Sequence, residues 1–166
     1  MLNKKRLWII INIILVIVWC AVIFYLSAQT AKLSDGQSKF IAGFIARTID
    51  KVDFKITPES ILINQIHSFN AVIRDLAHAF SYLVLALLTV NLGRQLKIKK
   101  WKTITFAFIF CSLYAYSDEI YQLFVPGRAF QLSDLRNDIL GAITGIIIYF
   151  LVVFLKRKIF SKRVTG

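Results

Sequence analysis

The sequence predicts an all-α polytopic membrane protein: a four-helix transmembrane bundle with an extracytoplasmic helical segment between helices 1 and 2. Of its 166 residues, 57% are of the AVILMFWYC type and 18% are charged, and the mean hydropathy is +0.65. A soluble domain is about 45–50% apolar even with Gly counted, and about 25% charged. A chain this short has too little interior to shield so many apolar side chains from water. The composition therefore argues against a disordered chain, a disulfide scaffold and a water-soluble enzyme.

The net charge of +12 is concentrated in three segments of the chain. Residues 4–6, 94–102 and 156–163 hold 13 of the 21 Lys and Arg residues and no acidic residue. Apolar runs separate the three segments, as is expected for cytoplasmic loops. A nucleic-acid-binding surface would instead need one continuous basic face. We therefore expect a lipid bilayer and no nucleic acid as partner, with both the N- and C-termini cytoplasmic.

Four apolar runs of about the length that crosses a hydrocarbon core follow one another along the chain. The first run is longer than the apolar part of a typical signal peptide, so we interpret it as an uncleaved anchor. An even number of spans returns the chain to its starting side, in agreement with the charge pattern. Residues 1–166 are thus predicted to form a single membrane domain, with spans at about 7–26, 76–92, 103–124 and 138–155 and an outer segment at 28–75.

The outer segment contains helical signals of its own. Ser34-Asp35-Gly36-Gln37 has the form of a capping box, and apolar residues follow at helical spacing from Phe40 to Ile49. This pattern predicts a short amphipathic helix, which either lies on the outer leaflet or packs over the mouth of the bundle. A second helix is expected to start at Thr57-Pro58.

Polar residues recur on one helix face from Ser60 to Tyr82. If a single helix runs from Pro58 to Leu92, this face descends from the outer surface into the membrane. A break at Asn70 or Arg74 is the alternative. In either case, Arg74, His78 and Tyr82 follow one another at intervals of four residues, and we expect them to face the interior of the bundle.

The third and fourth predicted spans bring further polar residues to the outer half of the bundle. Gly141 and Gly145 form a GxxxG motif, which presses the face that also carries Asp134 and Asp138 against a neighbouring helix. Ionisable groups inside a membrane indicate a functional site, because they are costly unless paired. The structural alternative is an ion-pair network that only orients the helices. The residues in question are Arg74, Asp75, His78, Asp118, Glu119, Gln122, Arg128, Asp134 and Asp138.

Binding of an envelope component is the first function that these residues suggest. Arg74 and Arg128, with Arg136 as a third candidate, can hold a phosphate, a carboxylate or a lipid headgroup through charge-assisted hydrogen bonds. The expected partner is then a lipid-linked or anionic envelope ligand. The residues expected to bind it are Arg74, Tyr82, Gln122, Arg128, Asp134 and Asp138.

The alternative is an intramembrane enzyme acting on a lipid-linked or phosphorylated envelope intermediate. Glu119 and Asp118, or Asp134 and Asp138, would be its acid–base or metal-binding pair, and His78 would carry protons. Oxygen ligands favour Mg²⁺ over Zn²⁺, but adjacent helical carboxylates point about 100° apart and cannot chelate one ion unless the helix breaks. A small transporter or flippase subunit is a second alternative. The residues leave catalysis, metal requirement and oligomeric state open.

The chain resembles the VanZ-like family, named for a membrane protein associated with low-level resistance to teicoplanin. The family pattern reads DE-x-x-Q-x-F-x-P-G-R and then D-x-x-x-[DN]-x-x-G-x-x-x-G, and residues 118–145 supply every fixed position. Tyr121 stands where His is common, and Asp75 stands where Lys is usual. The resemblance implies a bacterial plasma-membrane protein that contributes to glycopeptide resistance, without a defined reaction. The other matching positions are Ser27, Gln29, Arg74, His78 and Tyr82.

Overall fold

The computed structural model describes residues 3–30, 36, 40, 44 and 59–164, and the side chains among them at 3–30, 36, 40, 44 and 72–159. Four helices make up this part of the chain, which contains no strand, so the predicted all-α class is confirmed. They are α1 (Lys4–Ser27), α3 (Glu59–Gln95), α4 (Lys100–Gln122) and α5 (Leu132–Val164).

Three helical stretches among the described residues are long and apolar enough to cross a membrane, namely Lys4–Ser27, Val72–Gln95 and Leu132–Ile159. Their large apolar side chains are widely exposed: Trp8 is 56% exposed, Ile17 62% and Ile147 61%. Such surfaces are suited to lipid, because a soluble protein rarely exposes extended apolar patches. The α4 helix has 23 residues, but polar side chains in its last two turns make it less apolar than those three stretches. Its predicted role as a fourth span therefore stays a prediction.

The helix boundaries differ from the predicted spans mainly in being wider. The basic loop expected at 94–102 is reduced to a short connection, because α3 continues to Gln95 and α4 already begins at Lys100. This connection is closed by backbone hydrogen bonds from Lys97 N–H to the Arg94 carbonyl (3.1 Å) and from Ile98 N–H to the Gly93 carbonyl (3.0 Å). Lys97 adopts the left-handed conformation (φ 59°) that such a helix end requires.

The α3 helix is continuous from Glu59 to Gln95, so neither Asn70 nor Arg74 breaks it. This confirms the single-helix interpretation for the backbone. The side chains of the polar face between Ser60 and Asn70 lie outside the described residues, as does most of the expected amphipathic helix near the start of the outer segment. At positions 36, 40 and 44 of that segment the backbone is helical.

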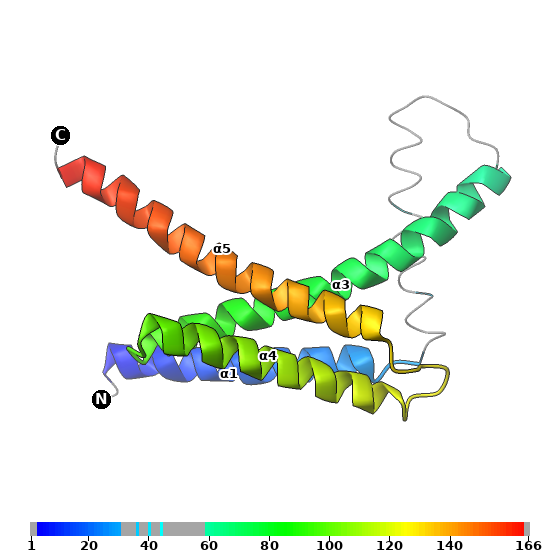
Figure 1. Ribbon diagram of the computed structural model, residues 1–166, viewed down its shortest axis with the longest axis horizontal. Helices are drawn as coiled ribbons and strands as arrows, with labels where there is room; N and C mark the ends of the chain where they lie inside the picture. The colour runs from blue at the N-terminus through cyan, green and yellow to red at the C-terminus, as the bar shows by residue number, and fades with distance from the viewer. Residues whose placement is uncertain (1–2, 31–35, 37–39, 41–43, 45–58, 165–166) are drawn as a thin grey trace.

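Successive helices run in opposite directions (Figure 1). The start of α1, the end of α5 and the α3–α4 connection lie at one end of the molecule, whereas the end of α1 and the α4–α5 connection lie at the other. The three basic segments thus gather at one end, which we call the basic end. This arrangement agrees with the alternating topology that the charge pattern predicts.

The most extensive packing is between α3 and α5, which cross each other in Figure 1. Gly141 and Gly145 lie at this crossing: a Cβ atom on Gly141 would collide with the backbone carbonyl of Ala79, and one on Gly145 with that of Leu83. The close approach therefore requires glycine at both positions. It also turns the face of α5 that carries Asp138 toward α3.

The α1 and α4 helices lie side by side and complete the bundle (Figure 1). Tyr114 donates its hydroxyl hydrogen to the Cys20 carbonyl at 2.7 Å, and the Trp19 indole donates to the Ser81 carbonyl at 2.8 Å. These bonds fasten α1 to α4 and to α3. Cys20 and Cys111 are both free thiols.

Candidate functional site

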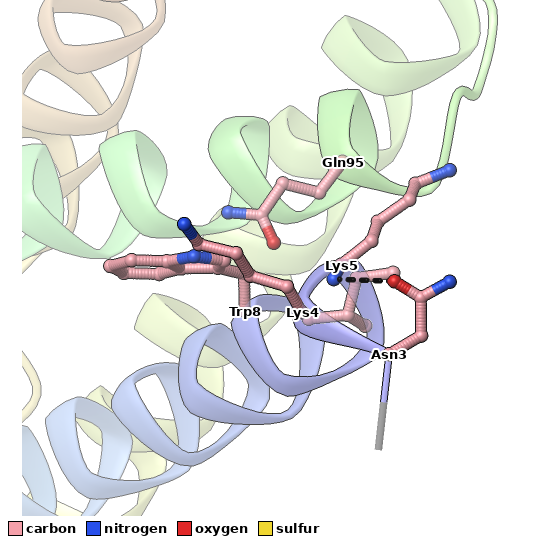
Figure 2. A pocket seen from close by; sticks show the side chains of 6 residues that line it. Asn3, Lys4, Lys5, Trp8 and Gln95 are labelled. Atoms are coloured by element: carbon pink, nitrogen blue, oxygen red, sulfur yellow. Dashed lines mark hydrogen bonds between the residues drawn. The ribbon is translucent and has the colours of Figure 1, made fainter. Parts of the chain in front are cut away.

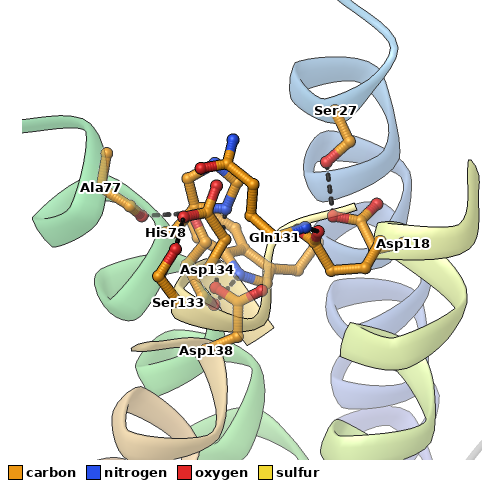
Figure 3. Close-up of polar contacts among 11 residues, drawn as sticks. Ser27, Ala77, His78, Asp118, Gln131, Ser133, Asp134 and Asp138 are labelled. Carbon is orange, nitrogen blue, oxygen red and sulfur yellow. Dashed lines mark hydrogen bonds and ion pairs between the residues drawn. The ribbon is translucent and has the colours of Figure 1, made fainter. Parts of the chain in front are cut away.

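The end of the bundle opposite the basic end collects buried polar side chains from α3, α4 and α5, with Ser27 of α1 beside them (Figure 3). Four carboxylates lie there that are almost fully buried: Asp118 (4% exposed), Glu119 (0%), Asp134 (2%) and Asp138 (0%). We refer to His78, Asp118, Glu119, Gln122, Asp134 and Asp138 as the polar cluster.

Asp118 links the end of α1 to the end of α4. The Ser27 hydroxyl donates a hydrogen bond of 2.6 Å to Asp118 Oδ2, and both residues are buried. The bond is visible in Figure 3 between the last turn of α1 and the neighbouring turn of α4. A hydrogen bond to a carboxylate at this distance is of the strong, charge-assisted kind. It fixes the depth at which α1 meets the cluster.

Glu119 points in a different direction and holds the loop that leads into α5. Its Oε2 accepts a hydrogen bond of 2.9 Å from the backbone N–H of Gln131, directly before Leu132 begins that helix. Asp118 thus contacts α1 while Glu119 contacts the α4–α5 loop, as expected for neighbours on a helix that point about 100° apart. The two carboxylates do not converge on one point.

His78 connects α3 to α5. Its Nδ1 lies 3.5 Å from Asp138 Oδ1, an ion-pair contact that is longer than a good hydrogen bond. Asp134 lies one turn before Asp138, and its Oδ1 accepts a hydrogen bond of 3.2 Å from the Ser133 hydroxyl. Figure 3 shows His78, Asp134 and Asp138 grouped together.

Arg128 follows the Pro126-Gly127 turn, where Gly127 has a φ of 78°. Its Nε donates to the Gln29 carbonyl at 3.3 Å, which ties the α4–α5 loop to the segment after α1. Burial lowers the pKa of the Arg128 guanidinium, and so does the positive charge of Arg74, while the nearby carboxylates raise it. An Arg side chain remains charged in a protein despite such a shift. Arg128 therefore interacts electrostatically with Arg74 and with carboxylates of the polar cluster.

Several buried polar atoms of the site have no hydrogen-bond partner among the described residues. Buried polar groups are normally paired, so each exception calls for an explanation. Acceptors outnumber donors, and a ligand that offers hydroxyl, amide or ammonium hydrogens would satisfy most of them. The atoms concerned are Arg74 Nε, Tyr82 Oη, Glu119 Oε1, Gln122 Oε1 and Nε2, Asp134 Oδ2, and both carboxylate oxygens of Asp138.

Within the described part of the chain, no group of three or more His, Cys, Asp or Glu side chains is arranged to hold a metal ion. Asp118 and Glu119 diverge, and Asp138 is directed toward His78. The Mg²⁺ site considered from the sequence gains no geometric support from these residues.

The structure gathers most of the sequence-predicted site residues at one end of the bundle. Asp75 is the exception: it is half-buried on α3 and forms no hydrogen bond or ion pair with the polar cluster within the described residues. Tyr82 is fully buried beneath the cluster, with its ring centroid 6.3 Å from that of Tyr114. Sequence reasoning did not assign a role to Ser27 or to the Gln131 amide. Ser27 could have been found, since it belongs to the matching family pattern. A backbone N–H such as that of Gln131 leaves no trace in the residue types.

The described helices and their buried polar cluster define an all-helical protein of the membrane type, with three stretches able to cross a bilayer. The family model described as VanZ/LLP1 matches residues 12–154, which is most of the chain. The chain therefore belongs to the VanZ/LLP1 family, and the resemblance seen in the sequence is confirmed. Neither a curated protein nor a solved structure gives a match to the chain.

Proposed function

We propose that this protein acts in the bacterial plasma membrane, with both termini cytoplasmic, and that its polar cluster faces outward and binds an envelope component. By binding or altering that component it contributes to resistance to teicoplanin-type glycopeptides. The orientation rests on the three basic segments gathered at the opposite end of the molecule.

One observation carries the proposal: fully buried polar side chains, collected where the helices end, have hydrogen-bonding atoms without a partner among the described residues. Gln122 is 0% exposed, and neither its oxygen nor its nitrogen is paired within the described residues. A network that served stability alone would have its polar atoms satisfied, because an unpaired buried group costs about 1–3 kcal/mol. Unpaired groups beside Arg74 and Arg128 instead fit a ligand with hydroxyl or amide hydrogens and an anionic group.

Mass spectrometry of envelope molecules that co-purify with the protein tests the binding step. We expect the wild type to retain an anionic envelope molecule and Arg128→Ala to lose it, since the guanidinium is removed. Arg136→Ala is the matched control, because Arg136, the third arginine that the sequence offers, is exposed on α5 near the same end. Equal retention by all three proteins would contradict the proposed binding role of Arg128.

An intramembrane enzyme acting on the same class of envelope molecule is the second candidate, and the His78–Asp138 contact favours it. A carboxylate next to an imidazole orients it for proton transfer. The two candidates differ in the fate of the bound molecule. An enzyme would convert it in purified protein, and His78→Gln would abolish that conversion while binding persists; a binding protein would release it unchanged.

A further inference from the structure

A second polar site lies at the basic end, far along the bundle from the polar cluster. A groove of about 550 Å³ opens between the first turns of α1 and the end of α3. Figure 2 shows Asn3, Lys4, Lys5 and Trp8 of the N-terminal segment and Gln95 of α3 around it. The proposed envelope-binding function makes no use of these residues.

The charge of the groove is uncompensated. Lys4 and Lys5 are both exposed, and neither forms an ion pair with a described residue. Asn3 is uncharged, and its Oδ1 already accepts one hydrogen bond, from the Lys5 backbone N–H at 3.2 Å. Figure 2 shows the Lys4 side chain extending toward Trp8 and the Lys5 side chain extending to the other side, past Gln95. An anion in the groove would therefore meet the Lys4 ammonium beside Trp8, with the charge of Lys5 at the rim and no carboxylate among the described lining residues.

Gln95 adds a hydrogen-bonding requirement to this charge. Its Oε1 is buried and has no partner among the described residues. A carbonyl oxygen accepts hydrogen bonds only, so a ligand with a hydroxyl group would satisfy it where a bare phosphate diester would not.

The position of the groove identifies the source of the anion as lipid. The apolar run of α1 starts at Leu7, and Trp8 is 56% exposed beside the groove. Exposed Trp residues are enriched at the level of lipid headgroups, because the indole ring is amphipathic and can contact both water and the apolar part of the membrane. Basic pockets between membrane helices are typical binding sites for anionic headgroups.

We propose that the groove between α1 and α3 binds an anionic phospholipid whose headgroup carries a hydroxyl, as in phosphatidylglycerol. The Lys4 ammonium holds the phosphate, Lys5 adds positive charge at the rim of the groove, the headgroup hydroxyl donates to Gln95 Oε1, and the acyl chains run along the exposed apolar face of α1.

Native mass spectrometry of the full chain in neutral detergent tests this inference, with three lipids that share the same acyl chains. We expect phosphatidylglycerol to bind most tightly, phosphatidylmethanol, which has the charge but no headgroup hydroxyl, less tightly, and phosphatidylcholine least. The Lys4→Gln/Lys5→Gln variant should weaken phosphatidylglycerol binding about tenfold. The matched control Lys156→Gln/Lys158→Gln removes the same charge from the end of α5 and should change binding less than about twofold.

Gln95→Leu isolates the hydroxyl contact. It should bind phosphatidylmethanol as the wild type does, which also shows that the variant is folded, but should lose the preference for phosphatidylglycerol. Soluble glycerol 1-phosphate should not displace the lipid; displacement would show that the groove recognises a free phosphate compound. Equal binding of all three lipids, or equal loss in the two double variants, would overturn the proposed site.

Discussion

Ser27 and Asp118 are the pair through which α1 is joined to the polar cluster. The hydroxyl lies 2.6 Å from Asp118 Oδ2, and both side chains are buried. The site can thus be disturbed from a residue that no ligand is expected to touch. Its role is to position Asp118.

Ser27→Ala should lower the free energy of unfolding by about 1–3 kcal/mol, because it leaves a buried carboxylate oxygen without its donor. Equilibrium unfolding in detergent measures the effect. Ser117→Ala is the matched control, since the Ser117 hydroxyl bonds to the Tyr114 carbonyl of its own helix and is exposed. If the two variants had equal stability, the Ser27–Asp118 bond would contribute nothing to the fold.

Lys97 occupies a position that favours glycine, because its φ is 59°. Lys97→Gly should raise the free energy of unfolding by about 1 kcal/mol by removing the steric penalty of a side chain in the left-handed region. Lys99→Gly should not stabilise the protein, because Lys99 has a φ of −55° and gains nothing from the freedom of glycine. Equilibrium unfolding in detergent, measured on both variants, tests this prediction. A loss of stability in Lys97→Gly would contradict the proposed steric penalty at Lys97.

At the scale of helices, the crossing of α3 and α5 sets the geometry on which the cluster depends. A side chain at Gly141 would meet the Ala79 backbone, which cannot move aside as a flexible side chain can. His78 and Asp138 lie next to this crossing, which brings His78 Nδ1 to 3.5 Å from Asp138 Oδ1.

Gly141→Leu should therefore destabilise the protein by at least about 1–3 kcal/mol, the usual cost of overpacking. Thr144→Leu is the control, because Thr144 lies on the same helix but is exposed. Thermal unfolding of the detergent-extracted variants measures both. Unchanged melting of Gly141→Leu would show that this face of α5 does not press against α3.

The sequence predicted the helical elements well because their signals are local. Apolar runs and basic flanks located α1, the membrane part of α3 and α5, and the spacing of Arg74 and His78 indicated the inward face. The loop at 94–102 was predicted too long, since helix propensity carries Lys100 and Lys102 into the first turn of α4. The crossing partner of the Gly141 face could not be predicted, because it depends on contacts between helices distant in sequence.

Part of the site was predictable in the same way. Ionisable residues such as Glu119 and Asp138 are energetically unfavourable inside a membrane. They can therefore be recognised in an apolar sequence whatever their partners are. Their partners were not predictable: Glu119 is held by a backbone N–H, and Asp138 by a side chain 60 residues away.

At the scale of the whole molecule, the alternating helices place the basic segments and the polar cluster at opposite ends. In a membrane this separation predicts the orientation of the protein, with the cluster outside. In a variant with Cys20 and Cys111 replaced by Ala, Gly36→Cys should react with an impermeant thiol reagent in intact cells. Lys99→Cys should react only after permeabilisation. The reverse pattern would place the polar cluster on the cytoplasmic side.

The central claim is that the polar cluster performs a function beyond holding the helices together. Glu119→Gln tests it, because the amide oxygen can still accept the Gln131 N–H while the charge is lost. Asp75→Asn is the control: the sequence groups Asp75 with the site residues, but its carboxylate forms no hydrogen bond or ion pair with the polar cluster within the described residues.

Glycopeptide susceptibility of cells expressing each variant, measured beside membrane level and melting temperature of the protein, is the deciding experiment. We predict that Glu119→Gln loses the resistance phenotype with nearly unchanged level and melting temperature, and that Asp75→Asn retains it. Loss of stability in step with activity would show that the cluster is structural, since breaking a buried ionic network costs about 3–5 kcal/mol. Full resistance in Glu119→Gln would likewise contradict the functional role of the polar cluster.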